Sequence, residues 1–113
     1  MKLDKSLLSG STGLLVLKLL EDGDKYGYQM TEELRRRSDK TFELKSGTLY
    51  PLLHTLEQKG YITAWEEASD SSRPRRCYHL TDTGRKHLAE KEQEWRTYAD
   101  AMVKVLKGGE GYA

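Results

Sequence analysis

The sequence predicts a mainly α-helical domain with one small β-hairpin. Leucines recur at helical spacing over residues 49–56, which indicates an amphipathic helix. Segments 61–65 and 76–80 alternate in side-chain character, which is typical of paired strands. Residues 88–106 carry a heptad spacing of mostly apolar side chains. At 113 residues and 36% hydrophobic content, the chain is one domain with a thin core, which favours burial against a partner.

Composition also excludes several classes of protein. No apolar run reaches the roughly 18 residues of a membrane span, and residues 1–10 lack the features of a signal peptide. Cys77 is the single cysteine, which argues against a disulfide and a thiolate zinc site. His54, His79 and His87 are scattered without acidic partners at ligand spacing. We therefore expect a cytoplasmic protein without catalysis, metal, cofactor or membrane contact.

Two helices are predicted in the N-terminal third of the chain. Residues 7–20 form a first helix that is apolar on most sides, with Gly10 and Gly13 weakening its early turns. A second, short amphipathic helix runs from about Gly27 to Ser38. Three arginines at 35–37 suit the negative end of its dipole, and a phosphate contact is their second interpretation.

The third helix is the clearest. Its apolar positions follow the i, i+3, i+4, i+7 pattern: Leu49, Leu52, Leu53 and Leu56. Gly60 stands where a left-handed C-terminal cap belongs. Ser46 and Thr48 are alternative N-caps: with Ser46, Pro51 removes a helical hydrogen bond, and with Thr48 it lies in the tolerant first turn. The sequence leaves both open.

A hairpin and a long helix complete the order of elements. The two strands flank a polar loop over residues 66–74, and Thr81 caps a last helix that runs to about Lys107. Three helices followed by a hairpin is the order of a winged helix, in which the third helix reads DNA and the hairpin is the wing.

A set of motifs recurs along residues 7–100. They are Tyr26-Gly27-Tyr28, the run from Gly47 to Leu53 with Leu56, Glu57 and Gly60, Arg73-Pro74-Arg75 with Tyr78, Leu80-Thr81 with Gly84, and Glu94-Trp95. In this order and spacing the chain resembles the PadR-like family of bacterial transcriptional regulators. It departs from some relatives at Ser46, where they carry a proline before the glycine.

The resemblance implies how the chain is divided and what it does. It implies a winged-helix DNA-binding domain over residues 1–81, a C-terminal dimerisation helix over 82–107, as in small family members, and a flexible tail over 108–113. We expect a homodimeric, sequence-specific regulator, a repressor by family habit, that binds double-stranded DNA. Two alternatives stay open: a winged-helix protein-interaction module, and a ligand-binding dimer without a DNA role.

The outward face of the third helix is the candidate DNA surface. By composition alone an ordinary solvated face is the better interpretation, and the family resemblance reverses that balance. Hydroxyl, imidazole and backbone groups there suit phosphates and base edges. The predicted contacts are Lys45, Ser46, Gly47, Thr48, Tyr50, His54 and Thr55. The resemblance adds Tyr26 as a phosphate contact, with a core aromatic as the alternative.

The wing loop is a second candidate DNA contact. Three arginines surround Pro74: Arg73, Arg75 and Arg76. A narrow minor groove attracts inserted arginine side chains, so we expect the wing to enter one. The alternative is a charged loop that keeps the hairpin soluble. Three acidic residues of the same loop oppose a DNA role: Glu66, Glu67 and Asp70.

The last helix carries a stripe suited to pairing with a second copy. Its members on this helix are Leu88, Trp95, Ala99, Met102 and Leu106, with the charged Glu92 in the same register. We expect Leu7 and Leu8 of the N-terminal segment, with Leu3, to join the same interface. Packing onto the chain's own domain is the alternative. A two-fold dimer would place its reading helices about 34 Å apart, which predicts a palindromic operator.

A planar aromatic ligand is a further hypothesis for this helix. The resemblance implies that Trp95 lies where some small family members have an open pore in the dimer centre. Ala99 leaves room beside it, and Met102 adapts to irregular shapes. The interpretation with more weight is that Trp95 only anchors the interface.

Overall fold

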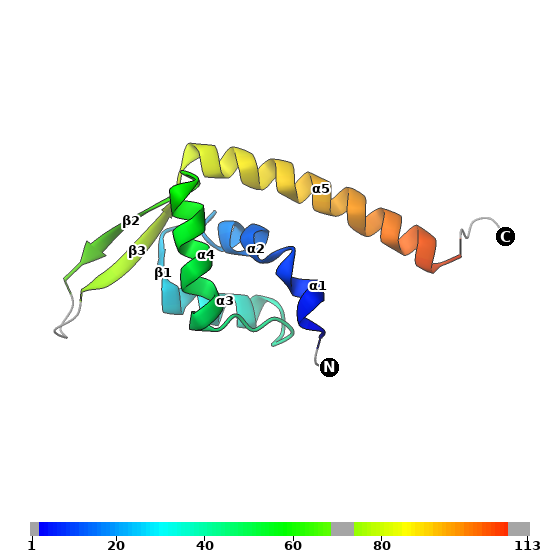
Figure 1. Ribbon diagram of the computed structural model, residues 1–113, viewed down its shortest axis with the longest axis horizontal. Coiled ribbons are helices and arrows are strands. Elements are labelled where there is room, and N and C mark those ends of the chain that lie inside the picture. Colours follow the sequence, from blue (N-terminus) through cyan, green and yellow to red (C-terminus); the bar gives the residue numbers. More distant parts are fainter. Residues whose placement is uncertain (1–2, 69–73, 109–113) are drawn as a thin grey trace.

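The computed structural model describes residues 3–68 and 74–108. The described elements are α1 (Lys5–Ser9), α2 (Thr12–Leu19), β1 (Lys25–Tyr26), α3 (Gly27–Arg37), α4 (Ser46–Gln58), β2 (Ile62–Glu67), β3 (Arg75–Leu80) and α5 (Asp82–Leu106) (Figure 1). The strands form an antiparallel sheet in the order β1-β3-β2. This is a winged helix followed by a long helix, so the predicted fold class is confirmed.

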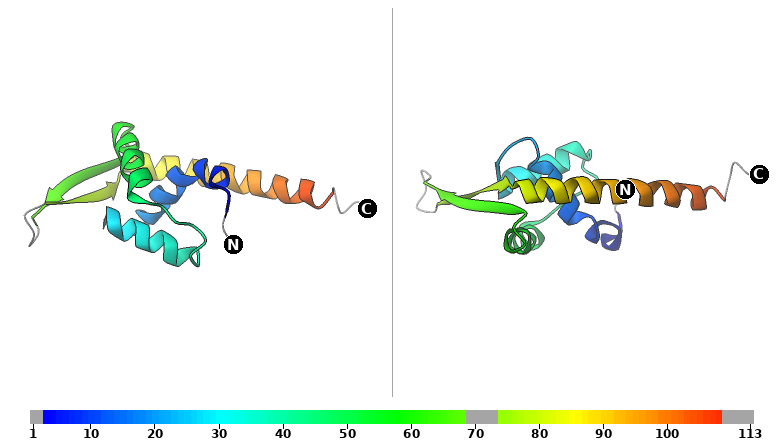
Figure 2. Two further views of the ribbon diagram at one scale, coloured as in Figure 1. Left: turned by 60° about the horizontal axis from the view of Figure 1, so that its bottom comes forward. Right: turned by 90° about the horizontal axis from the view of Figure 1, so that it is seen from above.

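The core lies between α2, α3, α4, one face of the sheet and the first turns of α5. Its most buried side chains are Val16, Leu17, Leu20, Met30, Leu49, Leu53, Ile62, Leu80 and Leu88. The wing, defined as the β2–β3 hairpin, is paired from Ile62 opposite Leu80 to Glu67 opposite Arg75. The wing therefore extends away from the core as a continuous antiparallel ladder (Figure 2).

The predicted first helix is wrong in one respect, because it is broken into α1 and α2. Gly10 closes α1 and Ser11 precedes α2. Glycine lowers helix stability by about 1 kcal/mol, and the Ser11 hydroxyl donates to the Leu8 carbonyl at 3.1 Å, which offers the backbone a local alternative. The break leaves α2 in the core and carries Leu7 outward, where it is 69% exposed.

The short strand β1 is absent from the sequence prediction, which placed Tyr26 beside the second helix. Lys25 pairs with Tyr78 and Tyr26 with Cys77. The Tyr26 amide then donates to Gln29 Oε1 at 2.8 Å as α3 begins. A two-residue strand has no periodicity of its own, so only its pairing with β3 defines it.

The ends of α4 follow the sequence prediction at one side only. Gly60 has a φ of +78°, and the amides of Tyr61 and Gly60 donate to the carbonyls of Leu56 and Glu57, each at 3.0 Å. This Schellman arrangement confirms the predicted C-cap. At the other end Lys45 is the N-cap, so neither Ser46 nor Thr48 caps the helix and Pro51 lies inside it.

Helix α5 begins as predicted and then leaves the body of the molecule. Thr81 Oγ1 accepts a hydrogen bond from the Gly84 amide at 3.0 Å, which confirms the cap. A Cβ at Gly84 would strike the carbonyl of Tyr61 and lie 2.7 Å from Leu80 Cδ1, so glycine permits this close approach. The radius of gyration is 16.5 Å. A compact domain of this length would have about 13 Å, and the excess reflects the projecting helix (Figure 2).

None of the helices in the described ranges has the length and apolar character that a membrane crossing needs.

Candidate nucleic-acid interface

Helix α4 turns its leucines inward and its polar side outward. Leu49, Leu53 and Leu56 are buried. The predicted contacts on the opposite side are all exposed: Lys45, Ser46, Gly47, Thr48, Tyr50, His54 and Thr55. The helix is therefore oriented as the leucine spacing predicted, and DNA contact by these residues stays a prediction.

Tyr50 joins α4 to the start of α3. A Cβ placed on Gly27 would collide with the Tyr50 hydroxyl and lie 2.8 Å from its Cζ. The absence of a side chain at Gly27 therefore gives the Tyr50 ring its place over α3, while Tyr50 stays about half exposed. This contact explains why a glycine stands between Tyr26 and Tyr28.

Tyr26 and Tyr28 form a stacked pair at the same place. Their ring centroids are 5.9 Å apart and the planes differ by 7°. The Arg75 guanidinium lies 5.4 Å from the Tyr26 centroid, a cation–π contact between the wing and the start of α3. Tyr26 is thus half-buried, and neither a core residue nor a side chain reaching freely into solvent.

The Tyr26 hydroxyl donates a hydrogen bond to the Glu67 carboxylate. Trp65 Nε1 donates to the same carboxylate at 3.2 Å. The bond with Glu67 raises the pKa of Tyr26. The bonds from Tyr26 and then Trp65 lower the pKa of Glu67, because both stabilise its ionised form. No local sequence pattern signals this pairing, because the partners are 41 positions apart.

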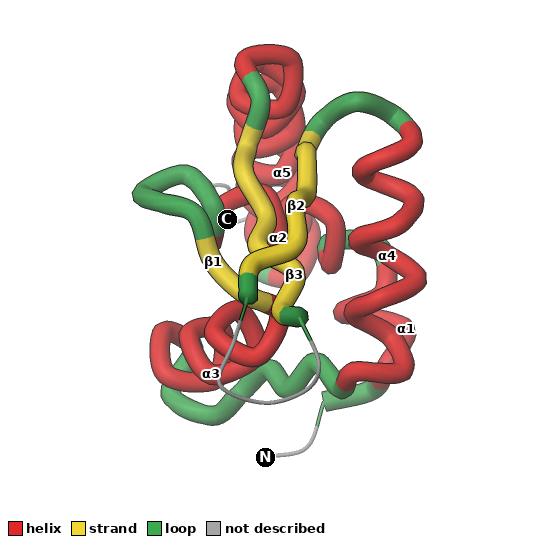
Figure 3. The backbone as a smooth tube through the Cα atoms, turned by 90° about the vertical axis from the view of Figure 1, so that its left-hand side faces the viewer, coloured by secondary structure: helices red, strands yellow, loops and turns green. Residues whose placement is uncertain are grey.

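A recess of about 360 Å³ lies between α3, α4 and the wing. It is lined by Tyr26, Gly27, Tyr28, Tyr50, Glu66, Pro74, Arg75 and Arg76. Viewed from the wing tip, α3 and α4 lie on either side of the hairpin (Figure 3). The structure thus brings together four predicted DNA contacts from three elements. Arg73, the remaining arginine of the wing prediction, lies outside the described residues.

Arg76 is held by helix α4. Its Nη2 lies 3.1 Å from Glu57 Oε1 and 3.0 Å from Glu57 Oε2. The Glu57 carboxylate is the main cause of the raised pKa of Arg76, so the guanidinium stays charged. This ion pair links the wing to α4.

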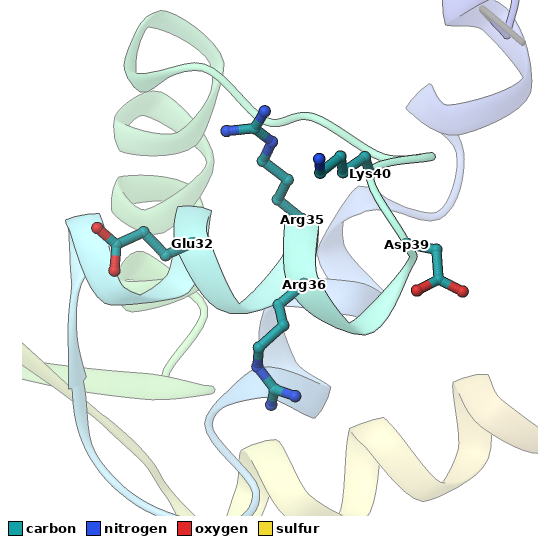
Figure 4. A pocket seen from close by; sticks show the side chains of 5 residues that line it. All are labelled: Glu32, Arg35, Arg36, Asp39 and Lys40. Carbon is teal, nitrogen blue, oxygen red and sulfur yellow. The ribbon is translucent and has the colours of Figure 1, made fainter.

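A larger recess of about 520 Å³ lies at the C-terminal end of α3, but its charged side chains do not point toward a common centre (Figure 4). Its lining residues are Glu32, Arg35, Arg36, Asp39 and Lys40, and the two arginines extend to opposite sides of the helix (Figure 4). Arg36 and Arg37 both bond Glu33, at 2.7 and 2.9 Å, and lower the pKa of that carboxyl to about 2. These contacts favour the structural interpretation of the arginine run.

The predicted pairing stripe on α5 requires one correction. Leu88 is 1% exposed and belongs to the core of its own chain, because the first turns of α5 pack against α2. Farther along, Trp95 is 50% exposed and Leu106 76% exposed. Met102 is also exposed, and Ala99 is partly buried. The stripe available to a partner therefore begins near Trp95.

Two grooves flank Trp95. One, of about 410 Å³, runs along α1 and α5 and includes Leu7, Leu14 and Tyr98. The other, of about 300 Å³, lies against α2 and includes Leu15, Phe42 and Lys18. At the end of the second groove, Glu92 bonds Lys18 at 3.2 Å and Arg96 at 2.9 Å. The charged residue within the stripe is thus paired inside the chain.

The side chains considered for chemistry have structural contacts. Cys77 is buried, and burial raises the pKa of its thiol, as expected for a packed cysteine. His79 contacts Asp24 at 2.7 Å, and His87 stacks on Tyr61 with centroids 4.1 Å apart. Within residues 3–68 and 74–108, no three metal-ligating side chains gather at one point.

The order of helices and the small antiparallel sheet define a winged-helix protein. The family model described as "Transcriptional regulator PadR-like family" matches residues 16–90, more than half of the chain. The chain therefore belongs to the PadR-like family of transcriptional regulators, as its motifs indicated. Its relatives are regulators of transcription rather than enzymes.

Three similar proteins illustrate the relation. A transcriptional regulator from Mycobacterium tuberculosis is 31% identical over 99 residues, covering 88% of this chain and 85% of the relative. The negative transcriptional regulator PadR from Bacillus subtilis is 29% identical over 73 residues, covering 65% and 40%. The crystal structure of a PadR family regulator from Eggerthella lenta has a TM-score of 0.80 and 32% identity, covering 92% and 88%.

Proposed function

We propose that this chain is a homodimeric repressor that binds a palindromic operator through α4 and the wing. The observation that carries this proposal is the recess in which Tyr26, Tyr50 and Arg75 meet beside the exposed face of α4. A second observation supports it: among the described residues, no side-chain hydrogen bond caps the start of α4 at Lys45. Its first amides are therefore available to a phosphate, which a helix N-terminus favours.

Residues 82–107 would form the dimer. The exposed apolar side chains of α5 extend from Trp95 to Leu106, on a helix that projects beyond the body. A stripe of this kind is stable in water when a second helix covers it. Pairing through α5, with Leu7 and Leu8 joining from α1, would leave α4 and the wing of each copy free to contact DNA. The similarity to the negative transcriptional regulator of Bacillus subtilis supports repression.

A test of DNA binding measures affinity for a duplex against salt concentration. Each phosphate contact contributes close to one power of salt concentration, so a DNA-binding module loses affinity steeply and a protein-interaction module does not. We expect Arg75→Ala to weaken binding about tenfold and to reduce the salt slope by about one.

Arg96→Ala is the matched control, because it removes the same charge from an exposed position on α5. Equal affinity of Arg75→Ala and the unmodified protein at low salt would contradict a DNA role for the wing. A flat salt dependence of the unmodified protein would favour the protein-interaction module.

A planar aromatic ligand that releases the operator is the second part of the proposal. The grooves beside Trp95 combine leucines and aromatic rings with charged side chains at their lining, a mixture that suits a flat apolar molecule with a polar edge. Quenching of tryptophan fluorescence by planar aromatic compounds should vanish in Trp95→Ala and persist in Trp65→Ala. The opposite pattern would place the ligand at the wing, and quenching unchanged in both would exclude the α5 grooves.

A further inference from the structure

The wing carries a carboxylate at the place where the proposed function requires a phosphate. Glu67 accepts hydrogen bonds from the Tyr26 hydroxyl and from Trp65 Nε1. Its cross-strand partner is Arg75, whose guanidinium lies over the Tyr26 ring. Two of these groups were expected to contact DNA, Tyr26 at a phosphate and Arg75 through the wing, and both lie beside this carboxylate.

A carboxylate and a phosphate compete for such groups because both offer negatively charged acceptor oxygens. Hydrogen bonds to an ionised acceptor are roughly twice as strong as neutral ones, so the Tyr26 hydroxyl does not leave Glu67 without a replacement of equal charge. The lowered pKa of Glu67 keeps it ionised at neutral pH. The free protein therefore holds Tyr26 in a closed, satisfied arrangement.

We propose that Glu67 is an internal competitor for a DNA phosphate, occupying the Tyr26 hydroxyl in the free protein and giving it up when the wing meets the backbone. This inference rests on the proposed DNA binding and adds a residue that sets its strength. Phosphate contacts carry no sequence information, so Glu67 lowers affinity for every duplex alike and reduces retention on non-specific DNA.

The adjacent Glu66 provides a matched control. It has the same charge on the same strand, and successive strand residues point to opposite faces of the sheet. Glu66 lines the recess beside the wing arginines, whereas the Tyr26 hydroxyl bonds Glu67. Glu66→Gln therefore measures the general effect of removing one negative charge near DNA, without releasing Tyr26.

The experiment measures the dissociation constant of a fluorescently labelled, mixed-sequence duplex of about 30 base pairs, long enough for two successive half-sites. The proteins compared are unmodified, Glu67→Gln, Glu66→Gln, Tyr26→Phe and the double variant Tyr26→Phe/Glu67→Gln, each at several salt concentrations. Thermal unfolding of each variant verifies that the fold is retained.

We expect Glu67→Gln to tighten binding about fivefold more than Glu66→Gln, as loss of one charged competitor predicts. We also expect the salt slopes of Glu67→Gln and Glu66→Gln to be equal, because both variants remove one negative charge and contact the same phosphates in the complex. In the Tyr26→Phe background, the gain from Glu67→Gln should fall to that of Glu66→Gln, since the contested hydroxyl is gone.

Three results separate the possibilities. Equal gains from Glu67→Gln and Glu66→Gln would overturn the inference and leave a general charge effect. Weaker binding by Glu67→Gln would overturn it as well, because Glu67 would then position Tyr26 for DNA. Absence of salt-dependent binding by the unmodified protein would instead refute the proposed function itself.

Discussion

The wing side of the molecule and the projecting half of α5 leave different kinds of surface for a partner. Beside the wing, polar groups are already paired within the chain, as in Tyr26 with Glu67 and Arg76 with Glu57. Along α5, by contrast, large apolar side chains face solvent, with Trp95 50% and Leu106 76% exposed. A charged partner at the wing must therefore exchange bonds, whereas a partner of α5 has only to exclude water.

Two leucines on α5 test the boundary between core and pairing surface. Leu88→Ala should lower the free energy of unfolding by about 3 kcal/mol at every protein concentration, because it leaves a cavity in the core. Leu106→Ala should lower it by less than about 1 kcal/mol, and only at concentrations at which dimers form. Urea denaturation at two protein concentrations measures both. Similar losses in the two variants would mean that the boundary is misplaced.

Two tryptophans test which exposed surface pairs. Trp95→Ala should raise the dissociation constant of the proposed dimer by at least about tenfold, since large aromatic anchors dominate interfaces. Trp65→Ala is the matched control: this indole is 38% exposed on the wing and should leave association unchanged. Sedimentation equilibrium measures the monomer–dimer distribution. A stronger effect of Trp65→Ala would place the interface at the wing.

The ion pairs of α3 predict a smaller effect of acid. Arg36 and then Arg37 lower the pKa of Glu33 from 4.5 to about 2. A depressed folded-state pKa stabilises the fold above pH 4.5, and this contribution is lost as the pH falls toward about 2. The urea midpoint should decline over that interval, and Glu33→Gln should flatten that part of the decline. A profile identical in the two proteins would show that these pairs do not contribute.

The features predicted correctly depend on neighbours in the chain. The leucine spacing gave the orientation of α4, and Gly60 and Thr81 cap their helices as expected. The features missed depend on distant contacts. Strand β1 exists because β3 pairs with it, and Leu88 is buried because α5 packs on α2. The recess itself was not predicted. Four of its residues were predicted separately, as DNA contacts on three different elements.

By itself, the sequence determined that a helical segment, two further helices, a hairpin and a long last helix follow one another, and it determined the inward and outward faces of α4 and the family. These follow from periodicity, caps and motifs, which act over a few residues. Tertiary structure alone decided that Glu67 engages Tyr26, that Glu57 holds Arg76, and that the apolar surface of α5 begins beyond Leu88. Partners separated by tens of positions meet only when the fold is complete, so no local pattern encodes their pairing.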